Sequence, residues 1–125
     1  MLRYDPLKAP DPEKWLAATE DERIKNVENY HRRAEIQMPK PKLHVIAHAV
    51  IETQLALELP DVTSAMKRML EQGLDRHEAL HALGQVLMEI YFDIQRGVFE
   101  DEVEDEYFRR LGRLTAKKWR NQEEI

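Results

Sequence analysis

Apolar residues recur at intervals of three and four along most of this 125-residue chain, and no stretch shows the alternation of a half-buried strand. This period predicts an all-α fold, a compact bundle of about five to six helices with no β-sheet. Capping residues, prolines and glycines mark the helix boundaries. They predict a short helix opened by Asp11 and Pro12, a second over 20–35, a third over 42–58, a fourth between Asp61 and Gly73, a fifth from Asp75 to about Arg96, and a last helix from about Asp101.

Length and composition narrow the class of protein further. A chain of 125 residues predicts a single domain, 1–125, in which 1–10 form an N-terminal extension and 98–125 a C-terminal helix with an acidic start and a basic end. A formal net charge of −5 argues against a nucleic-acid binder, and no apolar stretch approaches the length of a membrane span. With no cysteine and no export signal, we expect a cytoplasmic protein. Six amphipathic segments in so short a chain also make a homodimer plausible.

The five histidines all fall on apolar stripes of the predicted helices. His44 and His48 lie one turn apart on 42–58, a helix that is apolar on two faces and is therefore expected to be central. His77 and His81 have the same spacing on the fifth helix, and His31 lies within the stripe of the second. Each imidazole is therefore expected to point toward the protein interior.

A buried imidazole needs a hydrogen-bond partner or a metal ion, because an unpaired buried polar group costs about 1–3 kcal/mol. Two H-x3-H pairs on facing helices can place four nitrogens around one cation. We therefore predict a transition-metal site made by His44, His48, His77 and His81. Imidazole favours zinc, with iron or nickel as alternatives.

Two carboxylates stand close to this predicted site in the sequence. Glu52 lies one turn beyond His48 and is expected to act as a fifth ligand or as a base, and Glu78 follows His77 directly. Four protein ligands would make a structural zinc, whereas an activated metal-bound water would need Glu52 or Glu78 to handle its proton. Both roles stay open, and no motif specifies a small-molecule substrate.

Residues 77–81 also match H-E-x-x-H, the motif in which two histidines bind zinc and the glutamate is the base of a peptidase. Leu87 occupies the position where a metzincin places its third histidine, and no strand is predicted that would hold a peptide. His48-x3-Glu52 followed by His77-x3-His81 resembles part of the hemerythrin pattern, which implies an oxygen-binding di-iron bundle in which His31 would stand for the histidine of the first helix. The last helix lacks the histidine of that pattern.

The two histidine segments resemble more broadly a bacterial family of small helical proteins, a domain of unknown function with paired HxxxH motifs. The residues that carry the likeness are Leu43-His44-x3-His48-x3-Glu52-Thr53-Gln54-Leu55 and 75–84, within a span of roughly 11–97. The resemblance implies a helical fold and important histidine helices, and it implies no reaction. The rival hypothesis is a metal-free structural or interaction module whose histidines form a buried polar cluster.

Overall fold

A computed structural model describes residues 3–34, 41–99 and 102–123 of the chain. The described residues form helices and no strand, which confirms the all-α fold. The helices are α1 (Pro12–Ala17), α2 (Glu20–Arg33), α3 (Pro41–Ala56), α4 (Pro60–Glu71), α5 (Arg76–Gln95), α6 (Val103–Arg113) and α7 (Ala116–Glu123). None of these helices is long and apolar enough to cross a membrane.

Side-chain caps begin three of the helices at the expected residues. Asp11 accepts hydrogen bonds from the first turn of α1, and Thr19 and Glu22 form a reciprocal capping box at the start of α2. Asp75 accepts from the backbone N–H of Glu78 and so begins α5. The second helix ends at Arg33, and the predicted end at Glu35 lies outside the described residues.

The connection between α3 and α4 differs from the expectation. The helix α3 ends at Ala56 rather than near Glu58, which adopts a left-handed backbone with φ of 57°. Pro60 is the first residue of α4. Proline is well tolerated at this position, because an N–H there would make no hydrogen bond within the helix. Leu59 therefore occupies the N-cap, and Asp61, where we expected this helix to begin, lies within its first turn.

The C-terminal segment is two helices and not the single helix predicted over 98–125. The helix α6 ends at Arg113, Leu114 is extended, and α7 begins after Thr115. The hydroxyl of Thr115 accepts from the backbone N–H of Lys118, as an N-cap does. The break turns α7 back toward the bundle, so that Trp119 is only 8% exposed and packs in the larger of the two apolar cores described next. The predicted start near Asp101 lies outside the described residues.

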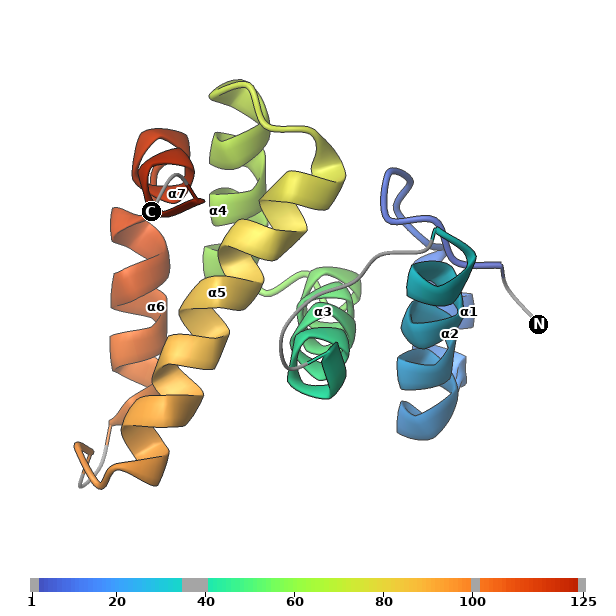
Figure 1. Cartoon of the computed structure of the whole chain (residues 1–125), viewed down its shortest axis with the longest axis horizontal. Coiled ribbons are helices and arrows are strands. Elements are labelled where there is room, and N and C mark those ends of the chain that lie inside the picture. Colours follow the sequence, from blue (N-terminus) through green and yellow to red (C-terminus); the bar gives the residue numbers. More distant parts are fainter. Residues whose placement is uncertain (1–2, 35–40, 100–101, 124–125) are drawn as a thin grey trace.

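Two apolar cores lie on either side of α3. The larger core joins α4, α5, α6 and α7, with Ile51 of α3 at its edge. The smaller core packs the N-terminal residue Tyr4, Trp15 of α1 and Val27 of α2 against α3. Figure 1 shows the resulting order, with α1 and α2 at one end, α3 in the middle and α6 and α7 at the other end.

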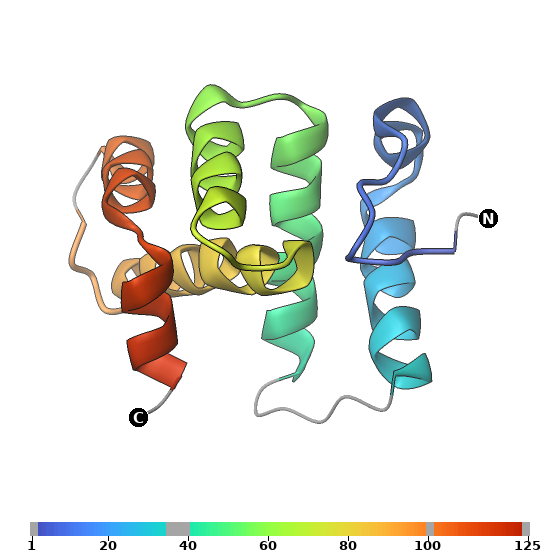
Figure 2. The same cartoon turned by 90° about the horizontal axis from the view of Figure 1, so that it is seen from above.

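The helix α5 crosses α3 and α4 steeply instead of running alongside them, as Figure 2 shows. The small residue Gly84 lies at this crossing, where a Cβ atom would be 3.8 Å from the Cβ of Ala47. Because α2 runs alongside α3 on the other side, α3 faces α2 and α5 at once. This position places the histidines of three helices next to one another.

Candidate metal centre

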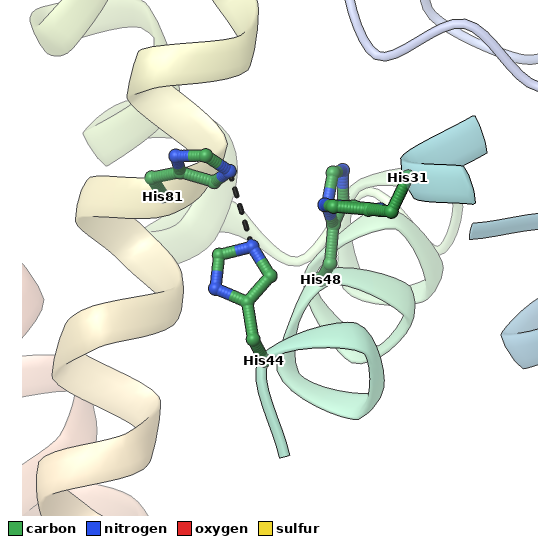
Figure 3. A group of neighbouring side chains, drawn as sticks. All are labelled: His31, His44, His48 and His81. Atoms are coloured by element: carbon green, nitrogen blue, oxygen red, sulfur yellow. Dashed lines mark hydrogen bonds between the residues drawn. The ribbon is translucent and has the colours of Figure 1, made fainter. Parts of the chain in front are cut away.

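Four histidines from three helices converge between α2, α3 and α5. One ring nitrogen from each of them lies within 4.8 Å of the others, and Figure 3 shows the rings facing a common space. We call these residues the four-nitrogen group: His31, His44, His48 and His81. The two predicted H-x3-H segments therefore do meet in space, but His31 takes the place in this group that the sequence assigned to His77.

The contact between α3 and α5 in this group is made by His44 and His81. Their Nε2 atoms are 3.2 Å apart, the distance drawn in Figure 3. Two neutral imidazoles hold this contact with one shared proton, because one ring donates and the other accepts. The separation is also close to the roughly 3.3 Å edge that two nitrogens span on a tetrahedral zinc with bonds near 2.05 Å. The pair is therefore already spaced as two ligands of one ion.

The ring of His31 has its protonation fixed by its own helix. Its Nδ1 lies 2.8 Å from the carbonyl oxygen of Val27, one turn earlier on α2. A carbonyl can only accept, so Nδ1 carries the proton and Nε2 carries the lone pair in the neutral ring. That Nε2 atom is buried and has no hydrogen-bond partner. His31 is thus oriented as a ligand.

A chain of hydrogen bonds fixes the protonation of His48 in the same way. The hydroxyl of Tyr4 donates to Oε2 of Glu52, and its oxygen lies 2.6 Å from Nε2 of His48. Since the only hydroxyl proton goes to Glu52, His48 must donate through Nε2 and keep its lone pair on Nδ1. The Nδ1 atom is buried and without a partner. Burial and the negative charge of Glu52 raise the pKa of Tyr4, which keeps its hydroxyl protonated as a donor.

Glu52 is the last acceptor in this series of hydrogen bonds, and it is not part of the four-nitrogen group. Its side chain is 1% exposed, and Arg76 donates to both carboxylate oxygens, at 2.7 Å to Oε1 and 2.8 Å to Oε2. We predicted Glu52 as a metal ligand or base, whereas the structure directs its oxygens to Arg76 and Tyr4. Burial lowers the pKa of Arg76, but the hydrogen bonds and charge of Glu52 outweigh this and raise it overall, so the guanidinium stays charged.

His77 and Glu78, the other two predicted site residues, lie at different distances from the group. The ring centroid of His77 is 4.3 Å from that of His81 and 6.1 Å from that of His31, so it lies beside the four nitrogens. Its Nε2 is also buried without a partner. Glu78 has an exposed side chain on the outer face of α5.

The cluster favours neutral imidazoles, as metal ligands require. Burial, followed by the charges of neighbouring histidines, lowers the pKa of His44 to about 4 and that of His81 to about 3. Burial also lowers the pKa of His48 and of His77, although for His77 the carboxylates of Asp75 and Asp5 act in the opposite direction. These four rings therefore keep a lone pair available at neutral pH.

The histidines of the cluster differ in burial. His31 and His48 are buried, whereas His44, His77 and His81 are half-buried. The buried side is closed by the N-terminal segment, since Arg33 donates to the carbonyl of Tyr4 and Arg76 donates to that of Pro6. The three half-buried rings are therefore the least enclosed part of the cluster.

Sequence reasoning missed two residues of this arrangement, Tyr4 and Arg76. Tyr4 lies in the segment interpreted as an N-terminal extension, where no helical period reports which side chains are buried. The available signal was that Tyr4 is the one aromatic residue of residues 1–10. For Arg76, the signal was its position directly before His77, at the start of a helix that carries two inward histidines.

Comparison of the chain with protein-family models, with curated proteins and with solved structures finds no match in any of the three.

Proposed function

We propose that this protein binds one transition metal ion through the imidazoles of His31, His44, His48 and His81, with zinc as the first candidate and iron or nickel as alternatives. The observation that carries the proposal is the convergence of four ring nitrogens within 4.8 Å on three helices. Each nitrogen comes from a residue type that binds these metals as a neutral ligand. The geometry of each ring adds to this support.

The hydrogen bonds around the group point in the same direction. His31 and His48 both use one nitrogen as a donor to an outer partner, and both leave the other nitrogen buried and unpaired. Metal-bound histidines usually have this arrangement, in which a carbonyl or carboxylate-linked acceptor fixes the ring. For His48 the acceptor is Tyr4, which Glu52 and Arg76 hold in place.

A metal-free cluster would have to bear an energetic cost. Four buried side-chain nitrogens in the described residues lack a partner, and three of them belong to His31, His48 and His77. An unpaired buried polar group costs about 1–3 kcal/mol, which is a large fraction of a typical folding stability of about 5–15 kcal/mol. A bound metal ion would satisfy the nitrogens of the group together. The cost of these unpaired nitrogens favours a metal-bound cluster over the metal-free interaction module.

The ligand set also favours a single ion over a di-iron centre of hemerythrin type. A di-iron centre in a helical bundle is built with carboxylates as well as histidines. Within the described residues the four-nitrogen group contains no carboxylate, and both oxygens of Glu52 bond Arg76. A peptidase has less support than a di-iron centre. Glu78 is exposed, whereas the H-E-x-x-H motif needs its glutamate base beside the metal.

Metal analysis of the purified protein tests the proposal. Protein expressed with zinc, iron and nickel in the medium is desalted and analysed by plasma mass spectrometry, and we expect one ion per chain. The double variant His44→Ala/His81→Ala removes two ligands on different helices and should lose that ion. The control variants Lys42→Ala and Glu78→Ala change exposed residues of the same two helices and should retain it.

A zinc titration of single variants keeps the proposal testable if the double variant fails to fold. Apoprotein is titrated with zinc in a competition assay against a chromophoric chelator, and the single variants His31→Gln and His48→Gln are compared with the unchanged chain. We expect each to weaken binding while the helical circular dichroism is kept. An unchanged chain that is fully folded, takes up no metal and shows no competition would overturn the proposal.

A further inference from the structure

We propose that the metal centre binds a small anion as an additional ligand, and that His77 donates a hydrogen bond to that anion from its Nε2. The anion is of the class of hydroxide, azide or cyanide, bound beside the half-buried rings of His77 and His81. This inference rests on the proposed function, because the anion is a ligand of the metal.

A divalent ion bound by the four-nitrogen group would lack a compensating negative charge from the protein. The four ligands are neutral imidazoles, and the buried carboxylate of Glu52 is already balanced by Arg76. A divalent ion in this group would therefore bring two uncompensated positive charges into a largely buried place. Burying unbalanced charge is costly, and a small anion on the metal is the direct way to reduce that cost. Zinc can expand its coordination from four to five ligands to accept one.

The ring of His77 is placed to form a hydrogen bond with an anion on the metal. Its ring lies beside the four-nitrogen group, with its centroid 4.3 Å from that of His81 and 5.6 Å from that of His48. It is the one histidine of the chain outside the four-nitrogen group, and its Nε2 is buried and unpaired. A buried polar atom next to a metal site, without a partner of its own, is placed to bond whatever else the metal binds.

The partial burial of His77 and the dipole of α5 also favour an anion at this place. His77 and the adjacent His81 are half-buried, so the cluster is less enclosed beside these two rings than beside the buried His31 and His48. His77 lies in the first turn of α5, where the helix dipole favours negative charge. Asp5 and Asp75 do not compete for the Nε2 proton of His77, since Asp5 accepts from the backbone N–H of Leu7 and Asp75 from that of Glu78.

Cobalt-substituted protein tests the inference. Co²⁺ replaces zinc in imidazole sites and gives visible absorption bands that change when an exogenous ligand enters its coordination sphere. We expect one Co²⁺ per chain and a saturable change of these bands on titration with sodium azide. The variant His77→Ala should still bind one Co²⁺ but should bind azide about tenfold more weakly, the effect of losing one hydrogen bond to a charged group.

Two further variants make the result specific. His77→Gln retains a side-chain N–H and should recover part of the azide affinity, whereas Glu78→Ala, the exposed neighbour, should behave like the unchanged chain. Cobalt bands that do not respond to azide, or azide affinity that is equal in His77→Ala, would overturn the inference and leave the metal site intact. Loss of Co²⁺ itself from His77→Ala would also overturn it, because His77 would then be a metal ligand. Failure of the unchanged chain to bind Co²⁺ would remove the proposed function as well.

Discussion

Nε2 of His44 on α3 lies 3.2 Å from Nε2 of His81 on α5, so that the two longest helices of the structure are joined at their crossing by a pair of imidazoles. Without a metal ion this contact is a single hydrogen bond between neutral rings. With an ion both nitrogens become ligands, and the same contact ties α3 to α5 more strongly. Stability of the fold and occupancy of the site are therefore coupled.

Zinc should raise the thermal stability of the chelator-treated protein. Binding to the folded state alone contributes about 2.7 kcal/mol when free zinc is 100 times its Kd. For a chain of this size, that corresponds to an increase in Tm of about 5–10 °C. Scanning calorimetry with and without zinc measures it, and EDTA should reverse it. The double variant His44→Ala/His81→Ala should show no increase in Tm. An increase as large as in the unchanged chain would mean that zinc binds outside the four-nitrogen group.

Tyr4→Phe should weaken zinc binding by about 10- to 100-fold, the usual effect of removing an outer partner of a metal-bound histidine. The change removes the hydroxyl that accepts from His48 and donates to Glu52, while it keeps the ring that packs on Trp15. Competition with a chromophoric chelator gives the Kd.

Tyr30→Phe is the matched control for Tyr4→Phe. Tyr30 also packs against His31 and Tyr4, but its hydroxyl makes no hydrogen bond within the described part of the chain. We expect its zinc affinity to be unchanged. Equal effects of the two substitutions would show that Tyr4 acts through packing and not through the protonation of His48.

Arg76→Met should destabilise the fold by about 3–5 kcal/mol, because it leaves the carboxylate of Glu52 buried without its cation. The double variant Glu52→Gln/Arg76→Met removes both charges and should recover much of that loss. Urea unfolding of the chelator-treated protein measures both. Lys67→Met is the control, since its ion pair with Glu71 is exposed and should be worth under about 1 kcal/mol. A double variant as unstable as the single one would contradict a charge-based explanation.

The all-α fold and most helix starts could be predicted because their causes are local. Asp11, Thr19 and Asp75 cap their helices through bonds to the next few residues, and sequence alone contains that information. The division of the last helix was missed, although Thr115 carried a start signal, because the apolar period continues across Leu114 with little change.

Which histidines form the four-nitrogen group could not be predicted from spacing. Two H-x3-H helices that ran side by side would bring both pairs together, but α5 crosses α3 steeply. His81 therefore lies opposite His44, and His77, one turn away, lies beside the group. The fourth nitrogen comes instead from His31, because α2 runs alongside α3, a relationship that depends on the smaller core and not on any local pattern.

Acid should destabilise the metal-free fold well before its carboxylates titrate. Folding lowers the pKa of His44 from 6.5 to about 4 and that of His81 from 6.5 to about 3. Between pH 6.5 and pH 4 the unfolded chain therefore binds protons that the folded protein does not, so the free energy of unfolding falls as the pH falls. Each such histidine contributes a slope of up to about 1.4 kcal/mol per pH unit.

Urea unfolding with EDTA at pH 7, 6 and 5 measures this slope. The variants His44→Gln and His81→Gln should each reduce it, because the replacement does not titrate, and Glu78→Ala should leave it unchanged. Zinc should make the loss steeper in the unchanged chain, since protons then compete with the ion for the same nitrogens. A free energy of unfolding that stays level from pH 7 to pH 5 in EDTA would mean that these rings take up protons in the fold as readily as in the unfolded chain, and it would contradict the lowered pKa values.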